Sequence, residues 1–476
     1  MNYREKNTKI VATISDLRCN VEFIQELYDH GLDVVRLNTA HQDFDGTKKV
    51  IDNVRKVSDK IGLLLDTKGP EVRTSNLVSD VVVAKGDEVL FSGDASVDSE
   101  RVVFVNYSNF HLDVPVGAEI LVNDGELSFN VLRKSDNALI CVANNSGVVK
   151  NKKTVNVPSV HLNLCSVSDK DKEFVNFAID NDLDFIAHSF VRSKEDVLAV
   201  QKLLDARNSD IKIIAKIENR EGVDNIDEIL DVAYGVMVAR GDLGVEVLAS
   251  EVPLMQKSII RSCLRRAKPV IVATQMLESM ISNPRATRAE VSDVANAILD
   301  GADAVMLSGE TAYGDNPVDA VRTMSEISIN LAKHHRKTNP AGVEPDSHSP
   351  KMFLAKSAVE AALALNASAI ITPSSSGEVA RVISAMRSRK PVFVPCFNEV
   401  VMRQLSLNHG IRVSSSFEYD NTDDLVCETV ETLLNNNDLK EDDLVVFISG
   451  APASVNNNSY FLEVASVRDL ICSYRS

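Results

Sequence analysis

Short apolar runs rich in β-branched residues recur along the chain and alternate with stretches of helical periodicity. The helical pattern is clearest after Thr287, where Glu290 gives capping-box spacing, apolar residues follow on one face, and Gly301 ends the segment. Near-continuous apolar strands that alternate with helices are typical of a parallel sheet covered by helices. We expect eight such strands, at residues 9–14, 34–38, 62–66, 185–190, 212–217, 235–240, 269–274 and 304–309.

Eight strand–helix units favour a closed (β/α)8 barrel, the TIM-barrel form of the α/β class. The pattern changes after Gly69, where short alternating strands predict a small inserted β-barrel, and again at 334–351, a polar segment that predicts a linker before a second strand–helix region. We expect a discontinuous barrel at 1–69 and 160–340, an inserted all-β lid at 70–159, and a C-terminal α/β domain at 341–476.

The insertion follows the third barrel strand and would overhang one rim of the barrel. We expect it to act as a lid that excludes water, and the alternative is a passive decoration. Its strands are expected at 80–91, 101–107, 118–129 and 138–143, and those of the C-terminal domain at 368–372, 391–396, 445–450 and 461–467.

Composition narrows the functional classes. A chain of 476 residues is too long for one core, and its formal charge of −17 disfavours nucleic acid as a partner. The seven cysteines are scattered without CxxC spacing, which suggests neither a disulfide framework nor a zinc site. No stretch has the apolar length of a signal peptide or a membrane span, so we expect a cytoplasmic protein without a membrane partner.

Two carboxylates carry the strongest chemical prediction. Glu218 follows the run at 212–217, and Asp242 follows the run at 235–240. If these runs are neighbouring parallel strands about 4.8 Å apart, the two anions lie at the same end of the sheet. They cannot both stay ionised in a dry site without a cation, so we expect a divalent metal there.

Other polar residues sit at the same strand ends, where chemistry in such barrels is built. Any one of them could be an ordinary polar residue at the start of a loop. Together they place cations and anions in alternation around one rim: Arg36, Asn38, Asp66, Lys68, Ser189, Lys216, Glu218, Arg240, Asp242, Thr274, Ser308 and Glu310.

Six segments resemble the signatures of bacterial pyruvate kinases, in that family's order and spacing: VVRLNTAH (34–41), DTKGPEVRT (66–74), AKIENREG (215–222), VARGDLGVE (238–246), ATQMLESM (273–280) and RATRAEVSDVANAILDGADAVMLSGETAYG (285–314). The resemblance covers nearly the whole chain. It implies a catalytic barrel, a lid, a C-terminal regulatory domain and an allosteric homotetramer. The implied reaction transfers the phosphoryl group of phosphoenolpyruvate to ADP, giving pyruvate and ATP in the final step of glycolysis.

The resemblance also assigns roles around the reacting phosphoryl group. Glu218 and Asp242 hold Mg²⁺ or Mn²⁺, for which oxygen ligands are suited. Lys216, two residues before Glu218 on the same strand face, stabilises the transferring group, and the alternative is a structural ion pair with a neighbouring carboxylate. Arg36 and Arg73 hold phosphate oxygens.

The remaining substrate contacts follow the same resemblance. The backbone of Ala239, Arg240 and Gly241 cradles the substrate carboxylate, with Gly241 permitting close approach. Thr274 lies near the carbon that is protonated and takes a positioning role in a proton relay, with water and Ser308 or Glu310.

Two assignments meet departures from the family pattern. The resemblance implies a K⁺ site at Asn38, Asp66 and Thr67, with Ala40 where the family has serine, while Glu71 matches the K⁺-dependent form. Nucleotide contacts are implied for Asn38, His41 and Arg73. The family's Gly-Pro-Ala-Ser loop, which lies near the nucleotide base in relatives, is replaced here by Ser15-Asp16-Leu17-Arg18, which bears on ADP as the acceptor.

A serine-rich segment in the C-terminal domain predicts a phosphate cradle. Ser374, Ser375, Ser376 and Gly377 follow a strand and open a helix. Glu378 stands where bisphosphate-activated relatives have a basic residue, and 453–460 lacks their glycines, so we expect a monophosphate effector such as AMP or a sugar monophosphate. The alternative is a helix cap without a ligand.

Two other functional classes stay open from the residues alone. A barrel lyase acting on enolpyruvate-type substrates also holds magnesium between Glu and Asp, but it would lack the lid and the MLSGETA segment. A non-catalytic relative is the second alternative, and Lys216, Arg36 and Thr274 speak against it.

Overall fold

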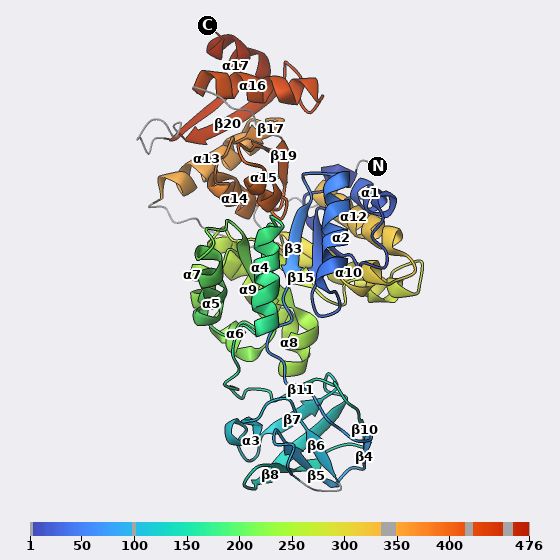
Figure 1. Cartoon of the computed structure of the whole chain (residues 1–476). Coiled ribbons are helices and arrows are strands. Elements are labelled where there is room, and N and C mark those ends of the chain that lie inside the picture. The colour runs from blue at the N-terminus through green and yellow to red at the C-terminus, as the bar shows by residue number, and fades with distance from the viewer. Residues whose placement is uncertain (1–2, 98–100, 335–348, 415–421, 451–459, 476) are drawn as a thin grey trace.

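A computed structural model describes residues 3–97, 101–334, 349–414, 422–450 and 460–475. The barrel lies in the middle of the molecule, the lid at one end and the C-terminal domain at the other (Figure 1). No helix in these ranges has the length and apolar character needed to cross a membrane.

Eight parallel strands close into a barrel in the order β1-β16-β15-β14-β13-β12-β3-β2, and each of the eight predicted runs contains one of them. Their bounds are β1 (Lys9–Thr13), β2 (Val34–Asn38), β3 (Gly62–Asp66), β12 (Phe185–His188), β13 (Lys212–Ile217), β14 (Gly235–Ala239), β15 (Val270–Ala273) and β16 (Ala304–Leu307). All but the polar strand ends are buried, because one face of each strand fills the barrel and the other packs on helices.

Helices cover the outside of the barrel (Figure 1). They are α1 (Val21–Asp29), α2 (Phe44–Val57), α4 (Asp169–Asp180), α5 (Lys194–Asp205), α6 (Arg220–Asp224), α7 (Ile226–Val232), α8 (Arg240–Glu246), α9 (Val252–Arg265), α10 (Arg288–Asp300), α11 (Gly309–Ala312) and α12 (Pro317–His334). The predicted capping box of α10 is confirmed: Thr287 and Glu290 exchange side-chain and backbone hydrogen bonds. Gly301 ends the helix at a φ of 106°.

The lid has a hydrophobic core of its own that includes Phe91, Phe110 and Phe129. Its strands form a curled six-stranded sheet, β11-β7-β8-β9-β5-β6, beside a two-stranded sheet, β10-β4. The elements are β4 (Val81–Val83), β5 (Glu88–Ser92), β6 (Val102–Phe104), α3 (Phe110–Asp113), β7 (Glu119–Val122), β8 (Leu127–Lys134), β9 (Leu139–Ala143), β10 (Gly147–Val149) and β11 (Val155–Asn156). The short strands β10 and β11 were not predicted.

The C-terminal domain is a five-stranded sheet in the order β19-β18-β17-β20-β21, with only the edge strand β21 antiparallel to its neighbour. Its elements are α13 (Pro350–Ala364), β17 (Ala369–Ile371), α14 (Glu378–Ala385), β18 (Val392–Pro395), α15 (Glu399–Leu405), β19 (Ile411–Ser414), α16 (Thr422–Asn435), β20 (Leu444–Gly450), β21 (Tyr460–Ser466) and α17 (Val467–Tyr474). β19 was not predicted.

One linker boundary was wrong. Residues 335–348 of the predicted linker lie outside the described residues, but Pro350 and Lys351 begin α13. Ser349 caps this helix through its side chain, and proline is well suited to the first helical turn because its missing N–H needs no partner there.

Two buried ion pairs join the C-terminal domain to the barrel. Arg387 Nη2 lies 2.8 Å from Asp303 Oδ2, and Arg403 Nε lies 2.6 Å from Asp184 Oδ1. Asp184 and Asp303 directly precede β12 and β16, so the contact is made at the amino ends of the barrel strands. The polar strand ends described next are at the opposite rim.

Candidate active site

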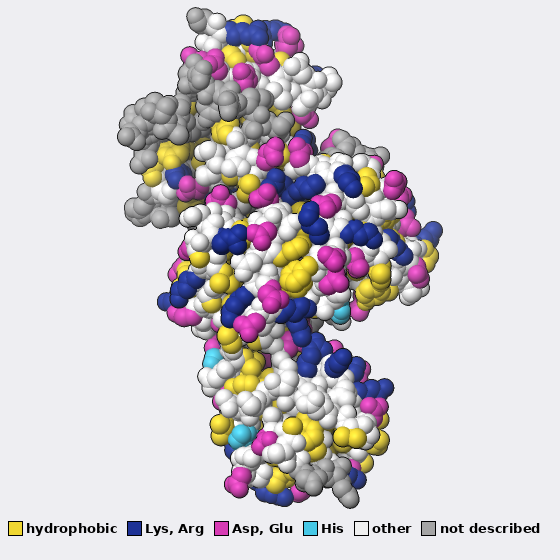
Figure 2. Space-filling model, viewed as in Figure 1, with side chains coloured by type: hydrophobic (Ala, Val, Ile, Leu, Met, Phe, Trp, Pro, Cys, Tyr) yellow, Lys and Arg dark blue, Asp and Glu magenta, His cyan; other side chains and the backbone are white. Residues whose placement is uncertain are grey.

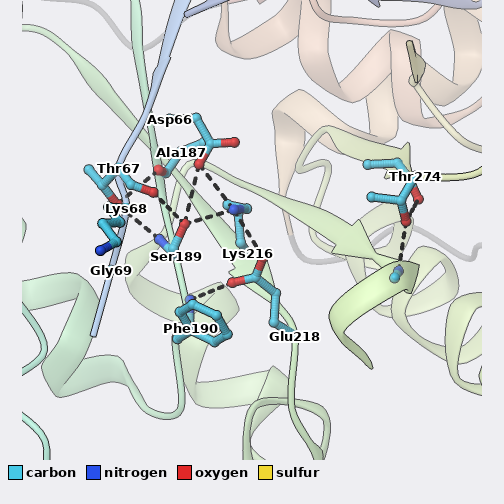
Figure 3. A network of polar contacts seen from close by, with 12 residues as sticks. Asp66, Thr67, Lys68, Gly69, Ala187, Ser189, Phe190, Lys216, Glu218 and Thr274 are labelled. Carbon is cyan, nitrogen blue, oxygen red and sulfur yellow. Dashed lines mark hydrogen bonds and ion pairs between the residues drawn. The ribbon is translucent and has the colours of Figure 1, made fainter. Parts of the chain in front are cut away.

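The centre of the polar rim is Lys216, near the carboxyl end of β13. Its Nζ lies 3.0 Å from Asp66 Oδ1 and 2.9 Å from Glu218 Oε1, and it donates a hydrogen bond of 2.7 Å to Ser189 Oγ (Figure 3). Only 8% of Lys216 is exposed. Burial disfavours the ammonium, but Asp66 and Glu218 outweigh it and raise the pKa of Lys216, so the side chain is a buried cation.

A second cation shares Asp66. Arg36 lies on β2, the neighbour of the strand β3 that ends at Asp66. Its Nε lies 2.6 Å from Asp66 Oδ2, and its Nη1 donates to Thr13 Oγ1 over 3.1 Å. Burial alone would raise the pKa of Asp66, but Arg36 and Lys216 hold it below its ordinary value. One carboxylate thus fixes two positive side chains at the mouth of the barrel.

Glu218 and Asp242 are brought together, although not in the way the sequence predicts. β13 and β14 are parallel neighbours, with Lys216 opposite Met237. Asp242 is not on an extension of β14, because the chain turns into α8 at Arg240. It approaches Glu218 from the first helical turn, where its charge contributes to raising the pKa of Glu218.

The two carboxylates have the electrostatics of a cation site. Burial is the main cause that raises the pKa of Glu218 to about 7, with the charge of Asp242 adding to it, and burial also raises the pKa of Asp242. One oxygen of Glu218 accepts from the Phe190 N–H over 2.6 Å. Within the described ranges no group of three or more His, Cys, Asp or Glu side chains could hold a metal ion, so a cation at these two oxygen donors would need further ligands from substrate or water.

A cavity of about 970 Å³ lies between this rim and the lid. It contains most of the predicted site residues, including Arg36, Asn38, Ala40, His41, Asp66, Thr67, Glu71, Arg73, Lys216, Glu218 and Asp242. Lys and Arg side chains gather where the lid meets the barrel (Figure 2).

Sequence reasoning missed several lining residues. Lys152 and Lys153 come from the lid and add positive charge to the cavity, and the basic stretch at 150–153 was the available signal. Ser189 was seen only as a polar strand end, and the structure makes it a direct partner of Lys216. Asn156 of the lid donates to Glu246 of α8 over 3.0 Å. This contact joins the lid to a barrel helix, and no local sequence pattern indicates it.

Arg73 is held by contacts within the lid. It forms an ion pair with Glu71 and donates from Nη1 to the carbonyl oxygen of Lys152 over 2.7 Å. Glu71 is therefore neutralised locally by Arg73.

Thr274 lies apart from the Lys216 network (Figure 3) and does not line the cavity. Its φ of 67° is in the left-handed region, which is strained for a β-branched residue. Thr274 Oγ1 accepts from the Gly241 N–H over 2.7 Å, so that N–H is already engaged. A Cβ added at Gly241 would meet the Thr274 side chain at an ordinary 3.6 Å, so the fold itself does not require glycine there, and the close approach of a substrate carboxylate stays a prediction.

The Arg240 side chain turns away from the cavity. It donates from Nη2 to the Thr274 carbonyl over 2.7 Å and pairs with Asp293 at 2.8 Å. Its observed role is to hold the strained end of β15.

Glu310 and the loop at 15–18 were also expected near the reacting groups, and both make structural contacts instead. The carboxylate oxygens of Glu310 accept from the backbone N–H groups of Leu277 and Ser308, at 3.1 and 2.7 Å. The loop at 15–18 binds the end of α11 and the residues just after it, with Ser15 Oγ donating to the Ala312 carbonyl and Arg18 to the Gly314 carbonyl. It does not line the cavity.

Comparison with known proteins decides the family. Residues 5–321 match the pyruvate kinase barrel domain, and residues 353–465 match the pyruvate kinase alpha/beta domain. The chain belongs to the pyruvate kinase family. Over 98% of its length it is 46% identical to the pyruvate kinase of Borreliella burgdorferi and 43% identical to that of Bacillus licheniformis, covering 98% and 81% of those proteins. A solved pyruvate kinase from Cryptosporidium parvum shares the fold, with a TM-score of 0.91 at 34% identity over 98% of this chain and 97% of that one.

The residues predicted to cradle a phosphate lie in the pyruvate kinase alpha/beta domain. Ser374 Oγ accepts from the Gly377 N–H over 2.7 Å, and Arg381 donates from Nη1 to the Ser376 carbonyl over 3.0 Å. Glu378 begins α14 and is paired with Lys351. The segment 453–460, which lacks the glycines of some pyruvate kinases, lies almost wholly outside the described residues.

Proposed function

We propose that this pyruvate kinase family member transfers the phosphoryl group of phosphoenolpyruvate to ADP, giving pyruvate and ATP as the last step of glycolysis. The observation that carries the proposal is the buried Lys216 ammonium, held beside Arg36 and two adjacent carboxylates at the mouth of a cavity that the lid covers. Pyruvate formation should be measured in a coupled assay with ADP, Mg²⁺ and K⁺ each present or omitted. No pyruvate in the complete mixture would contradict the proposal.

The three cationic side chains at the cavity, Lys216, Arg36 and Arg73, have separable tasks. The reaction brings two polyanions together, so catalysis depends on positioning and on positive charge more than on covalent chemistry. Lys216 stabilises the transferring phosphoryl group, and Arg36 and Arg73 hold phosphate oxygens. Phosphoenolpyruvate would displace part of the Asp66 and Glu218 pairing that these cations make in the free protein.

Glu218 and Asp242 are the proposed ligands of Mg²⁺ or Mn²⁺. Their oxygen donors suit a hard cation, and the raised pKa values of both groups are what a pair of buried carboxylates without a cation has. The ion, when bound, supplies positive charge to the substrate carboxylate and phosphoryl oxygens. The backbone at 239–241 is the proposed cradle for that carboxylate, although the Gly241 N–H must first leave Thr274 Oγ1.

Thr274 keeps a proposed positioning role in proton transfer to the enolpyruvate carbon. Its hydroxyl already bridges the Gly241 N–H and the Ala273 carbonyl, so it is oriented by backbone on both sides. Glu310 is a poor relay partner because both of its oxygens hold backbone N–H groups. Ordered water therefore remains the better candidate for the proton donor.

A K⁺ ion is the proposed second cofactor, at oxygens of Asn38, Asp66 and Thr67. We expect the rate to rise with K⁺ and not with the smaller Li⁺, and Glu71→Lys to reduce this dependence by supplying a fixed cation. Rate measurements in rigorously K⁺-free buffer are the check. Glu119→Lys, the same change on an exposed lid strand, is the matched control and should keep the K⁺ dependence.

Full activity of the unmodified protein without K⁺ would contradict this assignment. In that case Ala40, which lacks the side-chain oxygen of relatives, would already mark a lost site. Arg73, which already neutralises Glu71, would then make a second cation at this position unnecessary.

A phosphorylated effector is proposed at Ser374, Ser375, Ser376 and Gly377. Arg381 supplies nearby positive charge, and Glu378, which takes up the charge of Lys351, disfavours a second phosphate. We expect AMP or a sugar monophosphate to lower the phosphoenolpyruvate concentration for half-maximal rate, and fructose 1,6-bisphosphate to act less well. Saturation curves at fixed ADP test this. Activation by the bisphosphate alone would overturn the charge argument, and no response to any phosphate would favour a simple helix cap.

The wider assignments also remain proposals. We propose catalytic barrel segments at 1–69 and 160–340, a lid at 70–159 and an effector domain at 341–476, in a cytoplasmic homotetramer. The family membership supports each of them.

A further inference from the structure

A small cavity lies at the junction of the barrel and the C-terminal domain, near the amino ends of the barrel strands. Its volume is about 70 Å³. The lining includes Thr8, just before β1, and Ser328 of α12 from the barrel side, and Arg387, Arg389 and His409 from the C-terminal domain. Both units therefore contribute polar side chains to it.

Three buried polar atoms of these lining residues have no hydrogen-bond partner in the described part of the protein: Thr8 Oγ1, Arg387 Nε and His409 Nδ1. Buried polar groups are rarely left unpaired, because desolvation without a new bond is costly. All three atoms belong to residues that line one cavity, so a polar group bound there could satisfy them.

The charge of the lining indicates the kind of group. Two arginines and no aspartate or glutamate line the cavity, in a chain whose net charge is −17. Arg387 is matched by Asp303 through its terminal nitrogens, which leaves its Nε–H to donate elsewhere. Arg389 is exposed and adds positive charge that this pairing does not use.

The remaining atoms are compatible with an anion. Ser328 Oγ accepts from the Thr8 N–H over 3.3 Å and keeps its own proton to donate. Burial, with the charges of Arg387 and Lys9, holds the pKa of His409 well below its ordinary value. The imidazole is therefore neutral and can present an N–H at Nδ1.

We propose that this cavity binds a small tetrahedral oxyanion, either phosphate or sulfate, between the barrel and the C-terminal domain. Its volume of about 70 Å³ is several times the roughly 10–15 Å³ that a cavity needs to hold one water molecule, and about half of the roughly 150 Å³ cavity that holds benzene, so it does not enclose a sugar or a nucleoside as well. Because the donors come from both units, a bound oxyanion stabilises the junction.

The first test compares two variants of adjacent residues. Inorganic phosphate is titrated into the full-length protein by calorimetry, with Arg389→Gln as the test variant. Lys390→Gln is the matched control, since Lys390 Nζ donates to Asn366 over 2.8 Å and is not part of the lining. The phosphate affinity of one class of site should fall by about tenfold or more in Arg389→Gln, because a charge-assisted hydrogen bond is lost. The same affinity should stay unchanged in Lys390→Gln. Equal binding by both variants overturns the proposal.

The second test uses the unpaired hydroxyl. Thr8→Val keeps the side-chain shape, so the ligand-free melting temperature should hold or rise, while the rise caused by phosphate should shrink. A lower melting temperature with an intact phosphate effect would mean that the hydroxyl serves the fold and not a ligand.

Two further arms identify the occupant. Crystals grown with selenate should give an anomalous peak within hydrogen-bonding distance of Thr8 Oγ1 and Arg387 Nε, and water density alone in the cavity overturns the proposal. Glycerol 3-phosphate should bind this site at least about tenfold more weakly than inorganic phosphate, because its organic part does not fit. Equal affinity would overturn the assignment to a free oxyanion.

Discussion

Replacement of Lys216 by methionine is expected to lower ATP formation from phosphoenolpyruvate and ADP by at least about 10²–10³-fold, the usual loss for one electrostatic contact to a transition state. The ammonium is buried and fixed on three sides by Asp66, Glu218 and Ser189, so it is oriented before substrate binds. Water does not substitute well for such a charge, because water at this position would have to reorganise as the phosphoryl group moves.

The second half of this prediction concerns proton transfer. Thr274 is oriented by Gly241 and Ala273, not by Lys216. Lys216→Met should therefore retain part of the ability to convert added enolpyruvate to pyruvate, which is followed by NMR in deuterated water. Near-normal ATP production by the variant would mean that the central assignment is wrong.

Stability needs a control, because methionine leaves Asp66 and Glu218 without their shared cation. Loss of one partner of a buried ion pair typically costs about 3–5 kcal/mol, so the melting temperature must be measured alongside the rate. Lys212→Met is the matched variant at the other end of β13. It should leave both the rate and the proton transfer unchanged.

Glu218→Gln is expected to raise the Mg²⁺ concentration for half-maximal rate by about tenfold or more, since a neutral amide replaces one of two anionic ligands. Stability should change much less. Burial already raises the pKa of Glu218 to about 7, so ionisation at this position is unfavourable in the metal-free protein and glutamine relieves it. Asp66 remains as a partner for Lys216.

Measurement of the rate against Mg²⁺ concentration tests this prediction. Asp242→Asn should raise the Mg²⁺ concentration for half-maximal rate in the same way. Glu221→Gln is the control, because Glu221 also lines the cavity but pairs with His161 instead of the rim network. An unchanged Mg²⁺ half-saturation in both Glu218→Gln and Asp242→Asn would show that the two carboxylates are structural.

Much of the barrel could be predicted because its signals are local. Each strand is a continuous apolar run, and α10 is bounded by a capping box and a glycine within its own sequence. β19 (Ile411–Ser414) was missed because it lacks such a local signal. It contains an arginine and a serine, and it depends on pairing with β18. Its strand conformation comes from its neighbour and not from its own pattern.

The candidate site was predictable as a set of residues but not as a geometry. Residue types and spacing indicated Lys216 and Glu218, yet nothing local indicates that Asp242 approaches from a helix. The left-handed Thr274 is held by Arg240, 34 residues earlier in the chain, and the β-branched side chain itself disfavours that conformation. Such tertiary contacts override local preference.

The short strand β12 links two distant parts of the molecule. Asp184, at its amino end, holds Arg403 of the C-terminal domain, and Ser189, just beyond its carboxyl end, accepts from Lys216. Four residues of extended chain span about 13 Å and barely stretch. β12 therefore connects the junction with the C-terminal domain at one rim to the Lys216 ammonium at the other rim without an intervening loop.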